Sequence, residues 1–332
     1  MSSFLNILTT VVQPDLFASA VRIATPLALA AIGGTICERS GVVNIALEGL
    51  MLISAFCGTA VALAAPGLFH VGPITATWIG VCAAVVAGVI ASSLHAFASI
   101  TLRADQVVSG TAINILALGL TGYMIQVLYH RTGTTDAAQI LPPLFAFKVH
   151  PTGGLGVVWD WFSGVFLGHS PLVYAAVIIA IVAQWALYRT RWGLRLRALG
   201  EHPRAADTVG ISVIRGRYMA VLMSGALAGL AGANLTLEQV GSFSENMTSG
   251  RGFIALAANI FGRWTPVGSY LASLLFGFAE SLEIRLQAFS NIIKVPPQFF
   301  LMLPYILTVV VLAGFMGRAI GPAAIGKPYE KD

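Results

Sequence analysis

The sequence predicts an all-α fold: a polytopic integral membrane bundle of about eight or nine transmembrane helices. Two features of its composition support this. Of its 332 residues, 57% are hydrophobic and only 10% are charged, and the mean hydropathy is +0.82. Soluble domains carry roughly 25% charged residues, which coat their water-facing surface. A chain with so few charges cannot cover such a surface, but it can dissolve in a bilayer.

The third observation is a series of apolar runs, because a helix needs about 20 apolar residues to cross the hydrocarbon core. The segment 252–261 is apolar but too short to cross unaided, so we expect a broken or re-entrant helix near residues 252–263. In the run 218–237, Gly225, Gly229 and Gly232 have the spacing that lets helix backbones approach closely. The candidate spans cover residues 16–36, 42–65, 74–94, 107–128, 171–187, 218–237, 267–278 and 299–316.

The positions of the basic residues predict which loops face the cytoplasm. Seven of the 19 Lys and Arg residues fall within residues 189–217, and short loops rich in Lys and Arg stay inside. The C-terminal tail carries Arg318, Lys327 and Lys331, so we expect it inside as well. An inside loop reaches an inside tail through an even number of crossings. The segment 252–261 must therefore contribute a crossing or a half-helix.

Counting spans backwards from the cytoplasmic loop places residues 129–170 outside. This long connection contains the motif WDWF at 159–162. Tryptophan is enriched at the level of the lipid headgroups, so the motif is typical of an interfacial anchor or, alternatively, of an element that docks a receptor. We expect residues 1–332 to form a single transmembrane domain that includes both loops.

The cytoplasmic loop, RTRWGLRLRALGEHPRAADTVGISVIRGR, contains a predicted short helix over residues 202–209. Pro203 is placed like a first helical residue and Gly210 like a helix terminator. The arginines around this helix allow two interpretations. The loop is either a topology determinant that anchors the chain, or a rigid surface on which another protein acts. The local residues leave both open.

Part of this loop resembles the coupling loop of permeases in the branched-chain amino acid and simple-sugar group of ABC importers. Two other stretches, ERSGVVNIALEGLMLISAF (38–56) and GRGFIALAANIFGRWTPVGSYLASLLFGFAE (250–280), are similar to the nucleoside-importer branch of that group. The resemblance covers residues 16–316 and departs from the group at FGRW (261–264), where many members have paired glycines. The coupling pattern, roughly R-A-x-G-x-x-x-x-A-A-x-x-x-G-I, is matched by Arg197, Ala198, Gly200, Ala205, Ala206, Gly210 and Ile211.

The resemblance implies that the chain is the permease subunit of an ABC importer for nucleosides, which moves solute by alternating access. The implied partners are a second, related permease, a cytoplasmic ABC ATPase and an extracytoplasmic solute-binding lipoprotein or periplasmic protein. The implied location is the cell inner (cytoplasmic) membrane. The residues expected to couple this chain to the ATPase are Arg197, Gly200, Pro203, Ala205, Ala206 and Gly210.

The sequence itself is compatible with a subunit that does no chemistry. It contains no G-x-x-x-x-G-K-[ST] loop, since Gly326–Lys327 lacks both the upstream glycine and the following Ser or Thr. We therefore expect ATP on a partner chain and no cofactor on this one. The few buried acids lack a nearby catalytic or metal-binding set. The net charge of +5 reflects the cytoplasmic loop, so we expect contact with membrane lipid and not with nucleic acid.

Polar residues inside the apolar runs are the candidates for a solute pathway. Asn44 and Glu48 are four residues apart, so on a helix they would share one face. A carboxylate near the bilayer centre costs about 2.5–3.5 kcal/mol, so such groups usually face a partner or a wet cavity. The alternative is that these side chains join neighbouring helices. The candidate pathway residues are Asn44, Glu48, Asn114, Asn234, Glu238 and Asn259, with Phe243 as an aromatic surface for a base.

Charged residues at the ends of the runs suggest ion pairs. We expect Glu38 and Arg39 to form a salt-bridged turn at the cytoplasmic edge of the membrane. Glu280 and Glu283, near Arg285, are typical of an ion-paired helix end.

Other functions stay open at this point. Within the same class, the chain could be a permease for simple sugars or branched-chain amino acids. A secondary transporter or channel would need intramembrane charges that bind a coupling ion. Glu48 and Glu238 could serve, but the arginine-rich loop would then have no role. A membrane enzyme is the weakest alternative, because it lacks a catalytic cluster.

Overall fold

The computed structural model describes residues 13–145, 154–288, 296–302, 306, 309–310 and 320–330. Within these residues all regular structure is helical, apart from an isolated bridge between Thr134 and Ser244. Seven of the described helical segments are long and apolar enough to cross a membrane. They are α2 (Pro14–Glu38), α3 (Leu47–Phe69), α4 (Pro73–Ala96) continued by the π-helical turn η1 (Phe97–Thr101), α5 (Gln106–Tyr129), α7 (Pro171–Arg189), α10 (Val213–Ala233) continued by the π-helical turn η2 (Asn234–Val240), and α12 (Pro266–Ala288).

The polytopic helical fold predicted from hydropathy is therefore confirmed, and the segment 252–261 is indeed a separate short helix, α11 (Arg251–Phe261). The predicted span 299–316 lies largely outside the described residues, which here include only α14 (Pro297–Leu301) and its neighbours. Three further short helices lie in the connections: α6 (Gly154–Phe166), α8 (Arg191–Glu201) and α9 (Pro203–Thr208).

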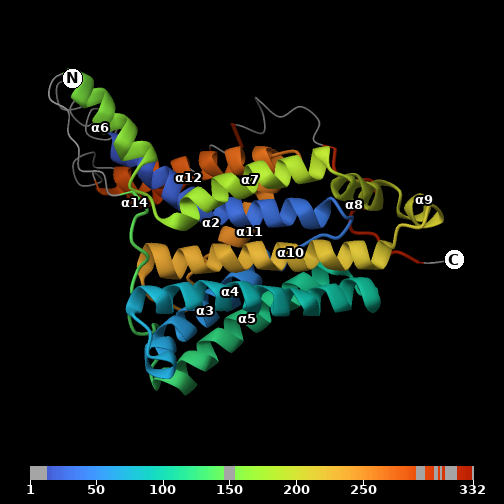
Figure 1. Cartoon of the computed structure of the whole chain (residues 1–332), viewed down its shortest axis with the longest axis horizontal. Helices are drawn as coiled ribbons and strands as arrows, with labels where there is room; N and C mark the ends of the chain where they lie inside the picture. The colour runs from blue at the N-terminus through green and yellow to red at the C-terminus, as the bar shows by residue number, and fades with distance from the viewer. Residues whose placement is uncertain are drawn as a thin grey trace.

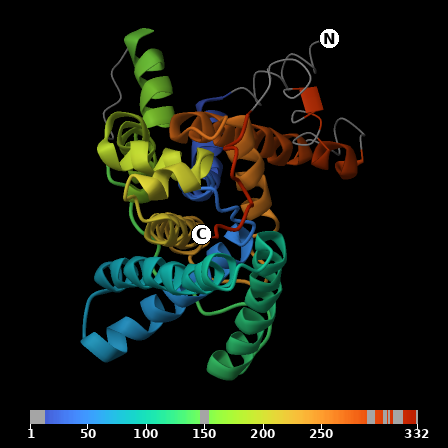
Figure 2. The same ribbon diagram turned by 90° about the vertical axis from the view of Figure 1, so that its right-hand side faces the viewer.

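Helix α10 lies between two groups of helices, with α2, α7 and α12 on one side and α3, α4 and α5 on the other (Figures 1 and 2). Small residues allow this close packing, as their spacing predicted. A Cβ on Gly225 would lie 2.5 Å from the carbonyl oxygen of Gly88 in α4, and one on Gly232 would lie 2.4 Å from the carbonyl oxygen of Met51 in α3. Larger side chains at these two glycines would force the helices apart.

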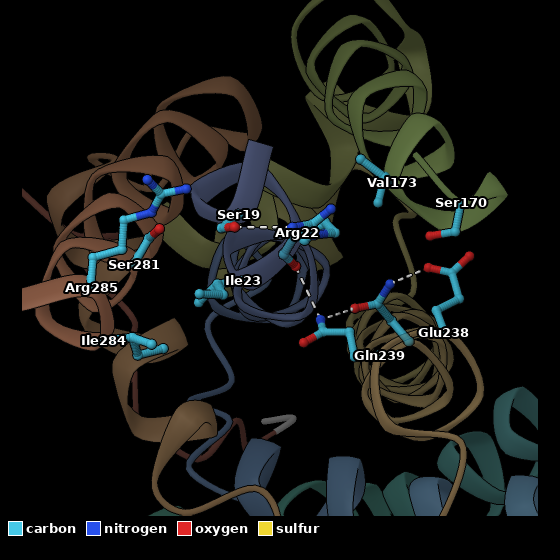
Figure 3. Close-up of a pocket in the computed structure, with 11 residues that line it drawn as sticks. Ser19, Arg22, Ile23, Ser170, Val173, Glu238, Gln239, Ser281, Ile284 and Arg285 are labelled. Atoms are coloured by element: carbon cyan, nitrogen blue, oxygen red, sulfur yellow. Dashed lines mark hydrogen bonds between the residues drawn. The ribbon is translucent and has the colours of Figure 1, made fainter. Parts of the chain in front are cut away.

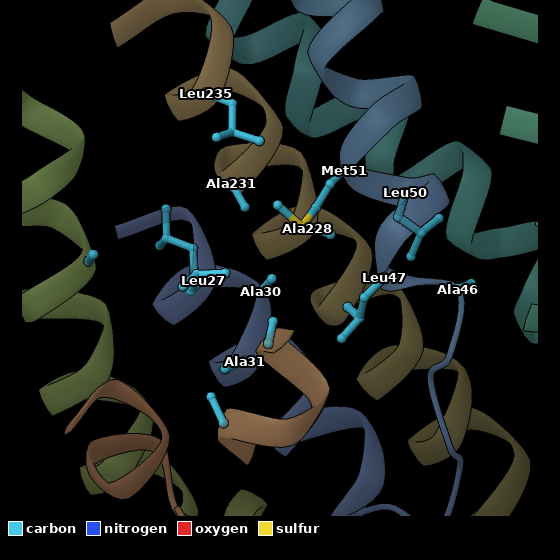
Figure 4. Packing of buried hydrophobic residues seen from close by; sticks show 14 of the residues in the cluster. Leu27, Ala30, Ala31, Ala46, Leu47, Leu50, Met51, Ala228, Ala231 and Leu235 are labelled. Atoms are coloured by element: carbon cyan, nitrogen blue, oxygen red, sulfur yellow. The ribbon is translucent and has the colours of Figure 1, made fainter. Parts of the chain in front are cut away.

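The main apolar cluster lies where α2, α3 and α10 meet (Figure 4). Leu27 from α2 and Leu47 from α3 are buried there, and Ala228 and Ala231 supply the facing surface of α10. Alternating large and small side chains fill the space between helices at the density of a protein interior. This core holds α2 in the middle of the bundle, so both of its ends are fixed relative to α3 and α11.

The two ends of the bundle carry the loops that the basic residues assign to opposite sides of the membrane. Helices α8 and α9 and the C-terminal segment gather at one end, and α6 lies at the other (Figure 1). At the α6 end, Thr135 N donates to the carbonyl of Phe243, and Trp161 of the WDWF motif packs on Phe17. This grouping agrees with a cytoplasmic loop 189–217 and an external segment 129–170.

Helix α3 begins at Leu47, five residues later than the apolar run suggests. Gly41 has a φ of 93°, and the residues between it and Leu47 are not helical. Side chains from distant helices replace the missing helical hydrogen bonds: Gln106 accepts from Val43 N, and Asn114 donates to Ile45 O. The expectation that Asn44 and Glu48 share one helix face is therefore wrong, because Asn44 precedes the helix.

Candidate functional site

Glu48 links two helices that begin inside the bundle. It lies in the first turn of α3, and its two carboxylate oxygens accept separate backbone amides at the start of α11. Gly250 N donates to Oε1 at 2.8 Å and Gly252 N donates to Oε2 at 2.6 Å. Helix N-termini favour negative charge, because their first amides lack partners in the helix. Glu48 thus faces the N-termini of both α3 and α11, an arrangement that stabilises a carboxylate away from water.

Glycine at position 252 is a requirement of this contact. A Cβ there would lie 2.4 Å from the backbone nitrogen of Glu48 and 2.8 Å from its Oε2. The start of α11 therefore approaches α3 more closely than any other residue would permit. This close approach makes Glu48 a connection between helices, and both of its oxygens are already in use.

The other two polar residues near Glu48 also join elements. Asn114 in α5 accepts from Gly49 N at 2.8 Å and donates to Ile45 O at 3.0 Å, so it holds the start of α3. Asn44 donates to Ser224 Oγ of α10 at 2.8 Å, and its own carbonyl oxygen is buried with no partner among the described residues. Of these residues, Asn44 alone retains a free hydrogen-bonding atom.

At the C-terminal end of α2, a buried polar network fixes the far end of α11. Glu38 is 2% exposed, and its Oε2 accepts from both Asn259 Nδ2 and Trp264 Nε1. Asn259 in turn accepts from the Thr35 hydroxyl at 2.7 Å. Glu38 does not pair with Arg39, so the predicted salt-bridged turn is wrong. Tertiary donors from α11 and the following turn satisfy the carboxylate instead.

The side chain of Arg39 holds the turn after α11 by hydrogen bonds to the backbone of that turn. Its Nε donates to the carbonyl oxygen of Trp264 at 2.7 Å, and its Nη2 donates to the carbonyl of Arg263 and to the Tyr188 hydroxyl. Arg263 and Trp264 both have φ near +54°, a left-handed conformation that glycine adopts without strain. This is the FGRW turn of residues 261–264. Here the contacts of Glu38 and Arg39 hold two larger residues in that conformation.

Asn234 and Glu238 lie at the opposite end, where they line a pocket of about 310 Å³ (Figure 3). Asn234 donates to Glu238, and Leu172 N donates to the second carboxylate oxygen at 2.8 Å. Gln239 connects Asn234 to the carbonyl oxygen of Arg22. The remaining lining residues are Ser19, Ile23, Ser170, Val173, Ser281, Ile284 and Arg285.

Sequence reasoning missed Arg22 and Gln239 in this pocket. Arg22 is the only charged residue in the run 16–36, and its guanidinium donates to Ser19. A lone arginine within a predicted span was the signal, because a charge there calls for a wet or polar surrounding. Beside the pocket, burial lowers the pKa of His169, so this imidazole adds no positive charge at neutral pH.

Two other candidates contact residues from other segments of the chain. Phe243 is fully buried and packs edge-on against Phe56 at 5.3 Å between ring centroids, so it offers no free face to a base. Glu280 pairs with Arg251 at 2.6 Å. Arg285 has a carboxylate oxygen of Asp15 3.9 Å away, so this helix end is ion-paired, as predicted, with partners from other segments.

The arginine-rich loop 189–217 folds into two helices where one was predicted. Thr190 caps α8 by accepting from Gly193 N. Arg197 lies over the ring of Tyr188, with 4.8 Å between its Cζ and the ring centroid. Gly200 lies so close to α2 that a Cβ would be 2.3 Å from the carbonyl oxygen of Arg39. This contact joins the end of α8 to the end of α2.

Helix α9 follows α8 directly and protrudes from the end of the bundle (Figure 1). It begins at Pro203, and Gly210 with φ of 81° ends the turn after it, as the sequence predicted. Ala205 is exposed, whereas Ala206 is 4% exposed and packs against Leu199 and Val213. Ala206 therefore seats α9 on its own chain, and Ala205 is the small residue that faces outward.

The chain belongs to the branched-chain amino acid transport system permease family, whose model matches residues 16–312. It is a membrane permease subunit of the ABC importer class. The chain is 43% identical to the guanosine ABC transporter permease protein NupQ of Bacillus subtilis, over 93% of this chain and 94% of that one. It is 41% identical to the nucleoside ABC transporter permease protein NupC of Lactococcus lactis, with the same coverage. A more distant relative, the guanosine permease protein NupP of Bacillus subtilis, is 26% identical over 77% of this chain and 70% of its own length.

Proposed function

We propose that this permease imports nucleosides across the cell inner membrane as a non-catalytic subunit of an ABC transporter. The observation that carries the proposal is full-length similarity above 40% to two permeases whose names state nucleoside or guanosine transport. Similarity at this level covers the spans, the coupling loop and the pocket alike. Permeases for simple sugars or branched-chain amino acids are the second candidate, which the family description supports.

The partners follow from the same relatives. Bacillus subtilis has two guanosine permease proteins, NupQ and NupP, and both are similar to this chain. We infer that a second, related permease completes the membrane part of the transporter. A separate cytoplasmic ATPase supplies the energy, since no phosphate-binding loop occurs in this sequence. An extracytoplasmic solute-binding lipoprotein or periplasmic protein delivers the solute.

Contacts between consecutive elements provide a route from the ATPase to the membrane interior. Movement of α9 reaches Arg39 through the close approach of Gly200. Glu38 and Arg39 then transmit this movement to the turn that contains Trp264, at one end of α11, because both side chains are hydrogen-bonded to that turn. Glu48 connects the other end of α11 to α3. Short helices joined in this way can rock as a unit, which is the motion that alternating access requires.

The pocket at the external end is the candidate entrance for solute. Its donors and acceptors, from Arg22, Gln239 and Ser170, suit the hydroxyls of a ribose and the polar edge of a base. Asn234 and Glu238 line it, which supports the pathway role proposed for them. Asn44, Glu48, Asn114 and Asn259 connect helices in this conformation, and Phe243 is covered. Their contact with solute depends on the other conformations of the transport cycle.

Reconstitution into proteoliposomes tests the proposal and its rival of another class. We expect uptake of labelled guanosine only when both permeases and the ATPase are present, with ATP on the side of the membrane where the ATPase lies. Uptake by this chain alone, driven by a proton or sodium gradient, would identify a secondary transporter and reject the proposal. Competition by unlabelled nucleosides, sugars and branched-chain amino acids then separates the two permease candidates.

A further inference from the structure

The C-terminal segment 320–330 crosses the cytoplasmic end of the bundle, and we call residues 321–330 the C-terminal strap. Its backbone is tied to two other elements. Ala324 N donates to the carbonyl of Gly200, at the end of α8, at 2.8 Å. Gly326 N donates to the carbonyl of Gly41, in the segment after α2, at 3.0 Å. The strap is thus fixed to the same place where α8 meets α2.

Further contacts place the strap beside α9. Tyr329 packs against the small apolar cluster that includes Leu199 and Ala206, the residues that seat α9. Glu330 pairs with Arg103 of the connection between η1 and α5 at 3.1 Å. In Figure 2 the strap, in red, passes close to the start of α10. The strap therefore reaches all the elements around α9 without belonging to any of the membrane spans.

A pocket of about 820 Å³ lies between the strap and α9. Two acidic residues line it, and both are already engaged: Glu201 accepts from Ala323 N, and Glu330 pairs with Arg103. The basic residues outnumber them. The pocket is lined by Glu201, His202, Pro203, Arg204, Ala205, Arg217, Ala323, Ala324, Lys327, Pro328, Tyr329 and Glu330.

Arg217, which lines this pocket, has a guanidinium group that is only partly hydrogen-bonded. Its side chain is 2% exposed. Only Nη1 has a hydrogen-bond acceptor, the carbonyl oxygen of Lys327 at 3.0 Å, while Nε and Nη2 are buried without a partner among the described residues. An uncompensated buried charge is strongly unfavourable. Arg217 and Lys327 give the wall of the pocket a positive charge, and a carboxylate placed in the pocket would offset that charge.

We propose that the C-terminal strap and α9 form one docking surface for the ATPase subunit, and that the basic pocket between them receives an acidic side chain of that subunit. The inference rests on the proposed function, which places the ATPase on α9. Ala205 is exposed on α9 and also lines the pocket, so a protein that covers α9 also covers the pocket opening. Charge complementarity at this site adds specificity to the contact.

A binding titration of the reconstituted permease pair with the purified ATPase tests this surface. Lys327→Glu reverses the charge of an exposed side chain. The contact that holds the strap here is made by the backbone carbonyl of Lys327, which accepts from Arg217, and so remains in the variant. We expect this variant to bind the ATPase about tenfold more weakly at low salt, with the difference shrinking as salt screens the charges. Arg215→Glu is the matched control, because Arg215 is exposed in the first turn of α10, at the same end of the bundle, and does not line the pocket. It should bind within about twofold of the unaltered protein.

Arg217→Gln provides a second variant, which keeps most of the side-chain volume and removes the charge. It should also weaken binding and reduce the dependence of affinity on salt. If Ala205→Glu abolishes binding while Lys327→Glu and Arg217→Gln bind normally, docking rests on α9 alone and the pocket proposal is wrong, although the proposed function stands. If Ala205→Glu also binds normally, the coupling role of α9 fails as well. A defect of Lys327→Glu that persists unchanged in high salt would likewise reject an acidic partner.

Discussion

Two buried carboxylates, Glu38 and Glu48, hold the two ends of the same short helix, α11, but they use different donors. Glu48 accepts one backbone amide on each of its oxygens, from Gly250 and Gly252. Glu38 accepts two side-chain donors, from Asn259 and Trp264, on the single oxygen Oε2. Glu48 thus accepts hydrogen bonds on both carboxylate oxygens, whereas Glu38 accepts them on one.

This difference determines at which of the two positions a glutamine could replace the glutamate and keep its hydrogen bonds. A glutamine at position 38 can put its carbonyl oxygen where Oε2 lies and keep both hydrogen bonds. At position 48 its amide group would have to face a backbone N–H, and two donors cannot satisfy each other. The donors also differ in how they can be changed. The backbone amides at the start of α11 remain in every variant, whereas the donors to Glu38 can be removed one at a time.

Glu48→Gln should have the largest effect of the variants considered for α11. It leaves one buried amide unpaired and weakens the other hydrogen bond, so we expect a loss of about 2–4 kcal/mol in the free energy of unfolding. Nucleoside uptake should fall more than tenfold, because the connection between α3 and α11 is lost. Denaturant titration in mixed micelles measures the first, and uptake in reconstituted transporter measures the second. An unchanged stability would mean that Glu48 does not hold α11.

Trp264→Phe should come next. It keeps an aromatic ring at this position but removes the indole N–H from which Glu38 accepts a hydrogen bond. Hydrogen bonds to charged groups contribute about 1.5–3 kcal/mol, and Asn259 still satisfies the carboxylate in part. We expect a loss at the lower end of that range in the same titration. If Trp264→Phe is as stable as the unaltered protein, Arg39 alone holds the left-handed turn at 263–264.

Gly252→Ala tests the close approach of α11 to α3 without replacing either glutamate. A Cβ there would meet the backbone of Glu48 at 2.4–2.5 Å, and overpacking of this kind costs about 1–3 kcal/mol. Gly250→Ala is a useful comparison, because a Cβ on Gly250 meets nothing within 4 Å but its φ of 87° disfavours a side chain. Equal stability of Gly252→Ala and the unaltered protein would show that the two helices can separate freely.

The membrane spans could be predicted from sequence because hydropathy alone defines them. The runs 74–94 and 107–128 match α4 and α5 to within two residues at each end. The start of α3 could not be predicted in this way. Residues 42–46 are as apolar as those that follow, and what keeps them out of the helix is hydrogen bonding by Gln106, Asn114 and Ser224, which lie far away in the sequence.

The candidate site also has features that the local sequence indicated and features that depend on residues far away in the sequence. Residue type placed Glu48, Asn259 and Glu238 either on a solute pathway or in contacts between helices, and in this structure all three are buried and hydrogen-bonded. Except for Asn234, which lies four residues before Glu238 in the same helical turn, their partners could not be predicted, because they lie on other segments of the chain. The adjacent charges of Glu38 and Arg39 suggested a local pair, yet both side chains bind the turn at 263–264 instead. Local sequence predicts that a polar group needs a partner, and only the fold decides which one.

Glu38→Gln should have the smallest effect, and it sharpens the comparison because it is the same substitution as at Glu48. Asn259 and Trp264 can both donate to the new carbonyl oxygen, so what is lost is the contribution of the negative charge to two hydrogen bonds. Bonds to neutral acceptors are weaker than bonds to charged ones, and we expect a total loss of about 1 kcal/mol, with uptake reduced less than in Glu48→Gln. Glu38→Ala, which removes the acceptor altogether, should be clearly worse than Glu38→Gln. If the glutamine variants at positions 38 and 48 lose the same stability, the distinction between one used oxygen and two is wrong, and burial of the charge would be the common cause.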